Sequence, residues 1–262
     1  NNTARIAKKY ANDRQKNAFG GQKNALGGQK NAFGEQKAQA KSRFPHADRK
    51  ISGLKITQTE KRKFMIIVFD TETTGLRPGR IIQLSYIIAS STDVKGKNFF
   101  FYTPYIEPSA VKVHGITPEK LAVLSGGHTF SEYLEEIDDD FSAASLTVAH
   151  NFSFDFSFMS AEFGYEDRIF HYTERFDTMR ELKSKVALPS LNGRGTYKYP
   201  KLIELADFYE IYDYDVTRKS IELFGDGATS HDARFDVTQT YLSLIAATQK
   251  HSDIAEIINK YF

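Results

Sequence analysis

The sequence predicts an α/β domain in which helices flank a mixed β-sheet. Residues 64–69 form a continuous apolar run that ends at Asp70, as is typical of a central strand covered on both faces. Segments with strand character come first along the chain and then alternate with helical segments, which favours a layered α/β arrangement. The 262 residues are 40% apolar and 13% aromatic, which is enough for a substantial core.

Short segments rich in apolar and aromatic residues predict the strands. The first three follow one another closely, so we expect them to form a meander. The fourth is short and leads into a helix that carries Asp155. The strands are expected at residues 64–69, 81–88, 98–102 and 146–149.

Longer segments predict the helices. One is expected to begin at Thr129, because Thr-Phe-Ser-Glu has the spacing of a capping box. Residues 176–178 are expected to enter a helix directly, and Ser252 is expected to cap the last one. Residues 188–200 are expected to form a loop. The helices are expected at residues 117–124, 129–141, 155–163, 178–185, 201–209, 233–249 and 252–261.

Residues 1–62 are expected to form a basic, repeat-containing, flexible arm, and residues 63–262 a single catalytic domain. Residues 1–64 hold 16 Lys and Arg against 4 Asp and Glu, a net +12, which leaves −10 for the remainder. A seven-residue repeat starts at Gln15, but its glycines each cost a helix about 1 kcal/mol, so a mostly disordered arm is expected. The asymmetry indicates tethering to a polyanion, although a solvated tail explains it equally well.

Several classes of protein are disfavoured by the composition. No run approaches the roughly 18–20 apolar residues of a membrane span, and the N-terminus lacks the apolar stretch of a secretory signal. The absence of cysteine excludes disulfides, cysteine nucleophiles and cysteine-ligated zinc. These features fit a cytoplasmic protein.

Two carboxylates stand at the end of the first strand. Asp70 and Glu72 are two residues apart, so their side chains share one face while Thr71 points to the other. Both can therefore reach the same cation. Surface strands often carry such pairs, but this pair ends a buried strand, which favours a functional interpretation.

Asp155 follows the short strand at residues 146–149 through His150 and Asn151, and phenylalanines flank it on both sides. Taken alone, an aspartate here is best interpreted as a helix cap. Beside Asp70 and Glu72, a role in the same site is favoured.

His231 and Asp236 are five residues apart, or about 140° around a helix, so two helical residues at this spacing would not share a target. A loop rich in small residues precedes His231, so we expect the helix to begin near Asp232, with Asp232 as its cap and His231 on the loop. Asp236 then points from the first turns toward the strand ends. A histidine on a solvent-reachable loop can act as a general base for water.

Four carboxylates in core-forming segments indicate a metal site, because buried carboxylates repel one another unless cations hold them together. Oxygen ligands suit two Mg²⁺ (or Mn²⁺) ions about 3.5–4 Å apart, the arrangement that promotes in-line displacement at phosphorus. Zinc would require more histidine or cysteine ligands.

The three segments resemble the three motifs of the DEDDh (DnaQ-like) 3′–5′ exonucleases, a family that includes the epsilon subunit of bacterial DNA polymerase III. Residues 70–75 match the first motif, residues 151–155 the second, and residues 231–236 the third with its histidine. Residues 113–117 also match a frequent family segment. The resemblance implies an RNase H-like fold, with a mixed five-stranded sheet flanked by helices.

The resemblance also implies roles for the catalytic residues. Asp70, Glu72 and Asp236 would bind the first metal ion, with Asp70 bridging to the second. Asp155 would help to hold the second ion, and His231 would deprotonate the attacking water.

Contacts with the substrate follow from the same motifs. Leu76 and Phe154 would touch the terminal bases in a way that tolerates any base, although core packing is the alternative for both. His150 either lines the site or satisfies a backbone group. The residues expected to bind the substrate are Thr71, Thr73, Gly75, Leu76, Phe154 and His150.

We therefore expect a two-metal 3′–5′ exonuclease that releases nucleoside 5′-monophosphates from single-stranded nucleic acid, with DNA favoured over RNA. The expected partners are single-stranded 3′ ends, a DNA polymerase complex and a second copy of the chain in a homodimer, and no membrane. Two alternatives stay open. One is an RNase H-like or integrase-like endonuclease, and the other is a non-catalytic accessory module that binds nucleic acid through the basic arm.

Overall fold

The computed structural model describes residues 64–76, 79–190, 196–225 and 228–261. The predicted arm at residues 1–62 and the middle of the predicted loop at residues 188–200 lie outside these ranges, and the domain boundary at residue 62 stays a prediction. Within the described ranges, every helix is too short or too polar to span a bilayer.

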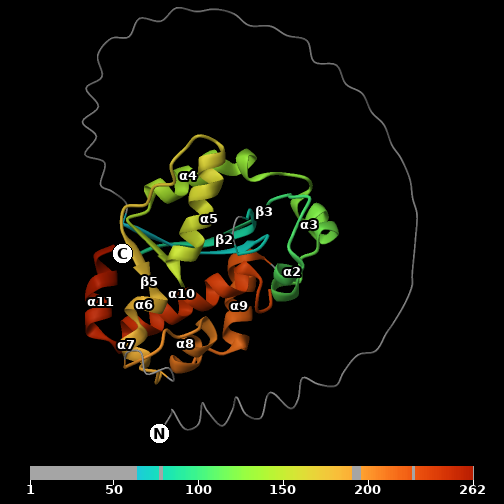
Figure 1. The fold of residues 1–262 in the computed structure, drawn as a ribbon. Helices are drawn as coiled ribbons and strands as arrows, with labels where there is room; N and C mark the ends of the chain where they lie inside the picture. The colour runs from blue at the N-terminus through green and yellow to red at the C-terminus, as the bar shows by residue number, and fades with distance from the viewer. Residues whose placement is uncertain (1–63, 77–78, 191–195, 226–227, 262) are drawn as a thin grey trace, which may run out of the picture. The chain divides into compact units, whose positions relative to one another are not determined.

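The sheet has five strands in the order β3-β2-β1-β4-β5, with β1 at its centre (Figure 1). The first three strands pair antiparallel as a meander, and β4 and β5 continue the sheet parallel to β1. The predicted mixed five-stranded sheet is therefore confirmed. The strands are β1 (Met65–Thr73), β2 (Ile81–Ser90), β3 (Val94–Phe100), β4 (Leu146–Ala149) and β5 (Arg175–Asp177).

Helices cover both faces of the sheet. In Figure 1, α4 and α5 lie on one side and α10 lies on the other, with α8, α9 and α11 packed against α10. The helices are α2 (Pro108–His114), α3 (Pro118–Ser125), α4 (Phe130–Ala143), α5 (Phe152–Tyr165), α6 (Thr178–Glu181), α7 (Lys183–Val186), α8 (Leu202–Phe208), α9 (Asp213–Phe224), α10 (Ala233–Lys250) and α11 (Ser252–Ile258), followed by the 3-10 turn η1 (Asn259–Tyr261).

The unbroken apolar run of β1 has a simple explanation, because alternate residues enter two different cores. Ile67 and Phe69 pack with the aromatic side chains of α4 and α5, where Phe69 makes edge contacts with Phe141 at 5.4 Å and with Phe152 at 5.7 Å. Ile66 and Val68 pack on the opposite face with α10 and its neighbours. The predicted central strand covered on both faces is confirmed.

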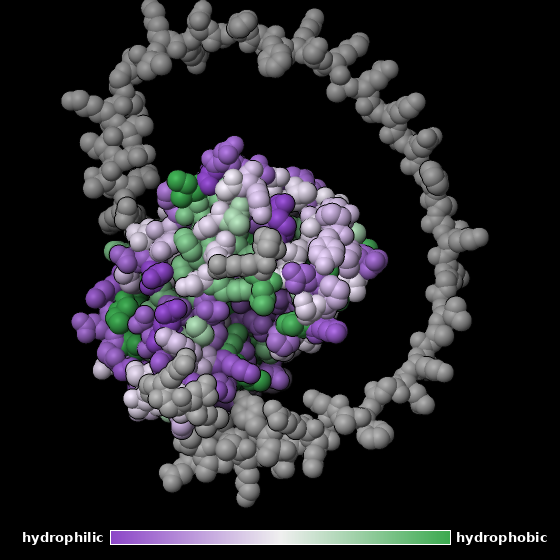
Figure 2. Space-filling model, viewed as in Figure 1, coloured by the Kyte–Doolittle hydropathy of each residue, from purple (hydrophilic) through white to green (hydrophobic). Residues whose placement is uncertain are grey.

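The polar exterior is interrupted by smaller apolar areas. On the face shown in Figure 2, apolar residues gather over α5, where Phe154 and Phe156 are only partly buried against the core. The first turn of this helix carries Asp155, so an apolar surface lies beside one of the predicted site residues.

The structure differs from the sequence-based expectations in four places. Residues 176–178 do not enter a helix directly, because residues 175–177 pair with β4 as a fifth strand. Two short helices, α6 and α7, then replace the single expected one, with a break at Leu182. Ser252 is the first residue of α11 and His251 is its N-cap, so Ser252 does not cap it. Helices α2 and α9 were not predicted.

Candidate active site

Three carboxylates from two distant segments meet at one end of β1. Asp70 and Glu72 continue the face of β1 that carries Ile66 and Val68, which α10 covers. Asp236 lies in the first turn of α10. One ligand oxygen from each of Asp70, Glu72 and Asp236 lies within 4.8 Å of the other two.

Asp155 reaches the same strand from the opposite face. It lies in the first turn of α5, and its Oδ1 accepts hydrogen bonds from the Thr71 backbone N–H at 3.1 Å and from the Thr71 hydroxyl at 2.7 Å. The N-cap of α5 is Asn151. The carboxylate of Asp155 is therefore bonded to β1, between the two residues Asp70 and Glu72.

Burial is the main cause that raises the pKa of all four carboxyls, and repulsion from nearby carboxylates adds to it. Burial raises the pKa of Glu72 to about 9, with repulsion from Asp236 the next cause. The pKa of Asp70 is raised well above its usual value by burial and then by repulsion from Asp155. Burial raises the pKa of Asp155 to about 7, against the opposing hydrogen bonds from Thr71. Burial raises the pKa of Asp236 to about 6.

This donor set fits hard divalent cations. Glu72 and Asp155 are buried and Asp70 and Asp236 are partly buried, and a nearby cation stabilises such carboxyls in their charged form. All of the ligand atoms are oxygens, which Mg²⁺ and Mn²⁺ prefer. Of the residues that the structure describes, Asp70, Glu72 and Asp236 form the group able to hold a metal ion.

His231 lies on the turn before α10, where it is exposed. Its φ of 65° is left-handed, a conformation that histidine adopts more readily than most residues. Asp232 is the N-cap of α10 and accepts a hydrogen bond from the Arg234 backbone N–H at 3.0 Å. The predicted separation of a loop histidine from a helical aspartate therefore holds. The positive charge of His231, when it is protonated, and its backbone N–H both lower the pKa of Asp236.

A cavity of about 350 Å³ opens beside Glu72. Five of the six residues predicted to bind the substrate line it, and Leu76 is 77% exposed, so it does not belong to the core. Phe154 packs against Phe158 with ring centroids 5.0 Å apart and also faces the cavity. The lining residues are Thr71, Glu72, Thr73, Gly75, Leu76, Ser109, Ala110, Val113, His114 and Phe154.

Helix α2 forms the other wall of this cavity, and sequence reasoning missed it as a helix. Two signals were present, since Pro108 occupies the first turn and Gly115 ends the helix at φ 70°. The start of α2 is held against β1, because Glu107 N–H donates to the Thr74 carbonyl at 2.8 Å. Gly75 leaves room for this approach, since a Cβ there would lie 2.3 Å from the Glu107 carboxyl.

His150 lies away from the cavity. Its Nε2 is 3.1 Å from the Pro200 carbonyl and its Nδ1 is 3.0 Å from the Thr178 hydroxyl. Because a carbonyl can only accept, this partner requires the Nε2–H tautomer. Burial lowers the pKa of His150 to about 4. Of the two interpretations offered for this residue, the contact with a backbone group is the one that the structure contains.

Residues 67–242 match the family model described as Exonuclease (RNase_T), and the chain therefore belongs to this exonuclease family. The match begins in β1 and ends within α10, so it includes all four carboxylates and His231. The family prediction made from the three motifs is confirmed.

Among individual relatives, DNA polymerase III subunit epsilon of Salmonella typhimurium is 33% identical over 120 residues, which are 42% of this chain and 48% of that protein. The epsilon subunit of Pasteurella multocida is 36% identical over 107 residues, 37% of this chain and 41% of that protein. The chain spans about half the length of the relatives that it matches. The crystal structure of E. coli Exonuclease I with a dA16 oligonucleotide shares the fold, with a TM-score of 0.55 and 19% identity over 74% of this chain and 42% of that one.

Proposed function

We propose that residues 63–262 form a metal-dependent 3′–5′ exonuclease domain that removes nucleoside 5′-monophosphates from single-stranded nucleic acid. The observation that carries this proposal is the meeting of the Asp70, Glu72 and Asp236 carboxylates within 4.8 Å. Their neighbour is a cavity with an apolar wall of Leu76, Val113 and Phe154. The carboxylate group suits the metal-assisted cleavage of a terminal phosphodiester, and the neighbouring apolar wall suits the terminal base of the strand.

Each residue of the site has a distinct role in this proposal. Asp70, Glu72 and Asp236 hold one divalent cation, and Asp155, held by Thr71, helps to hold a second. When bound, two Mg²⁺ or Mn²⁺ ions supply Lewis-acid activation and charge neutralisation for an in-line displacement at phosphorus. His231 accepts the proton of the attacking water at its imidazole, and its exposed loop position lets it approach the water.

The cavity residues orient the substrate. Leu76 and Phe154 contact the terminal base through apolar surface, which does not distinguish one base from another. We favour DNA over RNA for two reasons. One relative is a subunit of a DNA polymerase. The structure of Exonuclease I contains a dA16 oligonucleotide, which is DNA. The same relatives suggest single-stranded 3′ ends and a DNA polymerase complex as partners. A homodimer and a cytoplasmic location also belong to the proposal.

A degradation time course tests this function. Single-stranded DNA and RNA of one sequence, labelled at the 3′ or the 5′ end, are incubated with the protein and Mg²⁺. We expect immediate release of the 3′ label as a mononucleotide, and a ladder of shortened fragments that retain the 5′ label. Release of the 5′ label first would overturn the polarity.

The two alternatives predict different outcomes when a circular single strand is added to the set of substrates. An endonuclease on this fold would cut a circular single strand, which an exonuclease leaves intact. A non-catalytic binding module would retain its nucleic-acid binding and show no Mg²⁺-dependent degradation at all. Asp70→Asn with Glu72→Gln serves as the matched variant, because both changes keep the side-chain shape and remove the charge.

A further inference from the structure

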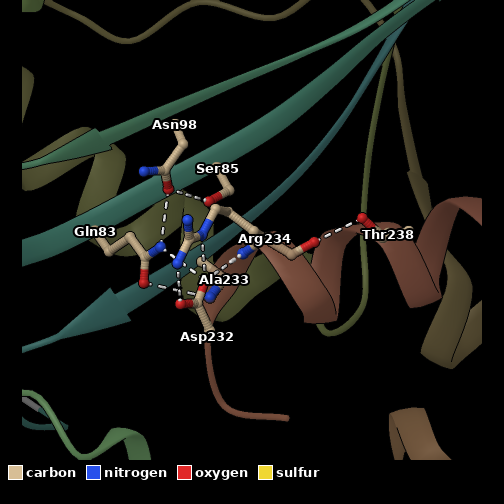
Figure 3. Close-up of polar contacts among 7 residues, drawn as sticks. All are labelled: Gln83, Ser85, Asn98, Asp232, Ala233, Arg234 and Thr238. Atoms are coloured by element: carbon tan, nitrogen blue, oxygen red, sulfur yellow. Dashed lines mark hydrogen bonds and ion pairs between the residues drawn. The ribbon is translucent and has the colours of Figure 1, made fainter. Parts of the chain in front are cut away.

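A network of polar side chains joins the start of α10 to the two strands β2 and β3 (Figure 3). The Gln83 side-chain amide donates to Asn98 Oδ1 at 2.8 Å and to Asp232 Oδ1 at 2.9 Å. Its carbonyl oxygen accepts from the Ala233 backbone N–H at 3.3 Å. The Ser85 hydroxyl donates to the same oxygen of Asn98 at 2.7 Å.

Both amide protons of Gln83 and its carbonyl oxygen have partners, and the residue is fully buried. A buried amide with all of these bonds formed is fixed in one orientation. Removing it would leave the Ala233 N–H, one of the free donors of the first helical turn, without a partner in a buried place.

The position of Gln83 links this network to the carboxylates. In the antiparallel pairing of β1 and β2, Gln83 stands directly opposite Glu72, and Ser85 stands opposite Asp70. Residues directly opposite each other point to the same face of a sheet. Gln83 on β2 therefore lies on the same face of the sheet as the two carboxylates of β1. On that face, Gln83 bonds to the start of α10.

Asp232 completes the link on the helix side. It caps α10 and pairs with the Arg234 side chain, with Arg234 Nη2 2.7 Å from Asp232 Oδ2. His231 comes immediately before Asp232, and Asp236 is one turn later with its backbone N–H bonded to the Asp232 carbonyl at 3.1 Å. The contacts that hold Asp232 and Ala233 in place therefore also set the distances of His231 and Asp236 from β1.

We propose that Gln83 is a positioning residue of the active site, which holds the first turn of α10 at the distance where Asp236 and Glu72 share a cation and His231 faces the water. This inference rests on the proposed exonuclease function. Gln83 is neither among the residues that line the cavity nor in the carboxylate group able to hold a metal ion, and it acts through Asp232 and Ala233.

The test compares Gln83→Leu with Tyr86→Phe in the same strand. The Tyr86 hydroxyl donates to Asp140 at 2.7 Å on the opposite face of the sheet, so its loss removes one hydrogen bond of β2 without touching α10. Three quantities are measured for each protein: Mg²⁺ affinity by titration calorimetry, kcat and KM on a labelled oligonucleotide, and the melting temperature. For Gln83→Leu we expect about a 10–100-fold loss of kcat and of Mg²⁺ affinity with little change in KM, and for Tyr86→Phe no change in either.

A second pair of variants guards against simple unfolding. Gln83→Glu places a carboxylate against Asp232 Oδ1, and we expect it to be as impaired as Gln83→Leu because like charges repel. Adding Asp232→Asn removes one of the two charges while the amide oxygen can still accept from the Arg234 backbone N–H that caps α10, so the double variant should recover part of the lost Mg²⁺ affinity and kcat.

The outcomes separate the two proposals. If Gln83→Leu keeps the wild-type Mg²⁺ affinity and kcat, or if Tyr86→Phe loses as much, Gln83 has no positioning role. If the wild-type protein degrades no nucleic acid, the exonuclease function fails, and the Mg²⁺ titrations of the four variants still decide whether Gln83 positions the carboxylates.

Discussion

At the scale of single residues, the alternation of side chains along β1 assembles the site from both faces of the sheet. Asp70 and Glu72 point toward α10, whereas Thr71 points toward α5 and binds Asp155. One short strand end therefore gathers carboxylates from helices that lie on opposite sides of the molecule. The regular pairing of β1 with β2 extends through Glu72 and shifts register between Glu72 and Thr73, where β1 ends.

His231 is the residue whose loss should affect turnover most selectively. Because it is exposed on a turn and is not among the residues able to hold a metal ion, His231→Ala should lower kcat by about 10²–10⁴-fold, the usual contribution of a general base. Mg²⁺ affinity and oligonucleotide affinity should change little. Steady-state kinetics and calorimetric titration with Mg²⁺ measure the two effects separately.

A second variant controls for the backbone of His231. The backbone φ of 65° at this position strains alanine more than asparagine. His231→Asn should therefore lose as much activity as His231→Ala but less stability. A parallel loss of Mg²⁺ affinity in both variants would assign His231 to the metal site and remove it as the base.

His150 should make folding sensitive to acid. Burial lowers its pKa to about 4 in the folded protein, against about 6.5 in an unfolded chain. Between these pH values, His150 is protonated in the unfolded chain and neutral in the folded protein. The free energy of unfolding therefore falls as the pH decreases from about 6.5 toward 4. The loss should approach about 3 kcal/mol.

His150→Asn lacks this titration and provides the comparison. Urea denaturation of both proteins between neutral pH and pH 4.5 gives two curves of unfolding free energy, and the contributions of all other groups cancel in their difference. The wild-type curve should fall more steeply below pH 6.5. Parallel curves would mean that His150 can be protonated without loss of its contacts.

At the scale of secondary-structure elements, α2 forms one wall of the cavity beside Glu72. Val113 lines the cavity and is 56% exposed, so Val113→Ala should leave the fold intact and remove apolar contact with the substrate. We expect KM to rise roughly fivefold, about 1 kcal/mol of lost contact, with kcat unchanged. Val123→Ala on α3, where the valine is 82% exposed and lies outside the cavity, is the matched control. A fall in kcat, or an equal effect of Val123→Ala, would argue against a cavity wall made by α2.

The same elements show what a sequence can predict and what it cannot. The central strands and α10 were predictable because β1 carries a continuous apolar run and α10 is a long segment without glycine or proline. Helix α2 has no fully buried residue, so no core-facing stripe marks it. Helix α9 is amphipathic but buries only Val216 and Ser220, and its periodicity was missed. Strand β5 has three residues and is a strand only because it pairs with β4.

The candidate site follows a similar division. Its carboxylates and histidine could be predicted because metal and base chemistry restrict the residue types and their spacing. The hydrogen bond from Thr71 to Asp155 joins residues 84 positions apart, and the contact of His150 with Pro200 joins residues 50 apart. Such contacts depend on how the helices pack, which a local pattern does not encode.

At the scale of the whole molecule, the charge distribution separates a basic N-terminal segment from an acidic remainder. Residues 1–64 carry +12 and the rest carries −10. An acidic body repels a nucleic-acid backbone, and its active site adds to this repulsion until cations bind. The basic segment is then the part of the chain with the charge to attract the polymer.

Deleting residues 1–62 should therefore leave a folded, active enzyme that binds single-stranded DNA more weakly and with less dependence on salt. The slope of log affinity against log salt counts the phosphate contacts, at about 0.7 per contact for a single strand, and fluorescence anisotropy at several NaCl concentrations measures it.

A full-length variant with every Lys and Arg of residues 1–62 changed to Gln is the matched control, because it keeps the length and removes the charge. Both proteins should show the same shallower slope, and kcat at saturating substrate should stay at the wild-type value. A slope unchanged by either alteration would reject tethering, and a truncated protein that fails to fold would reject an independent domain at residues 63–262.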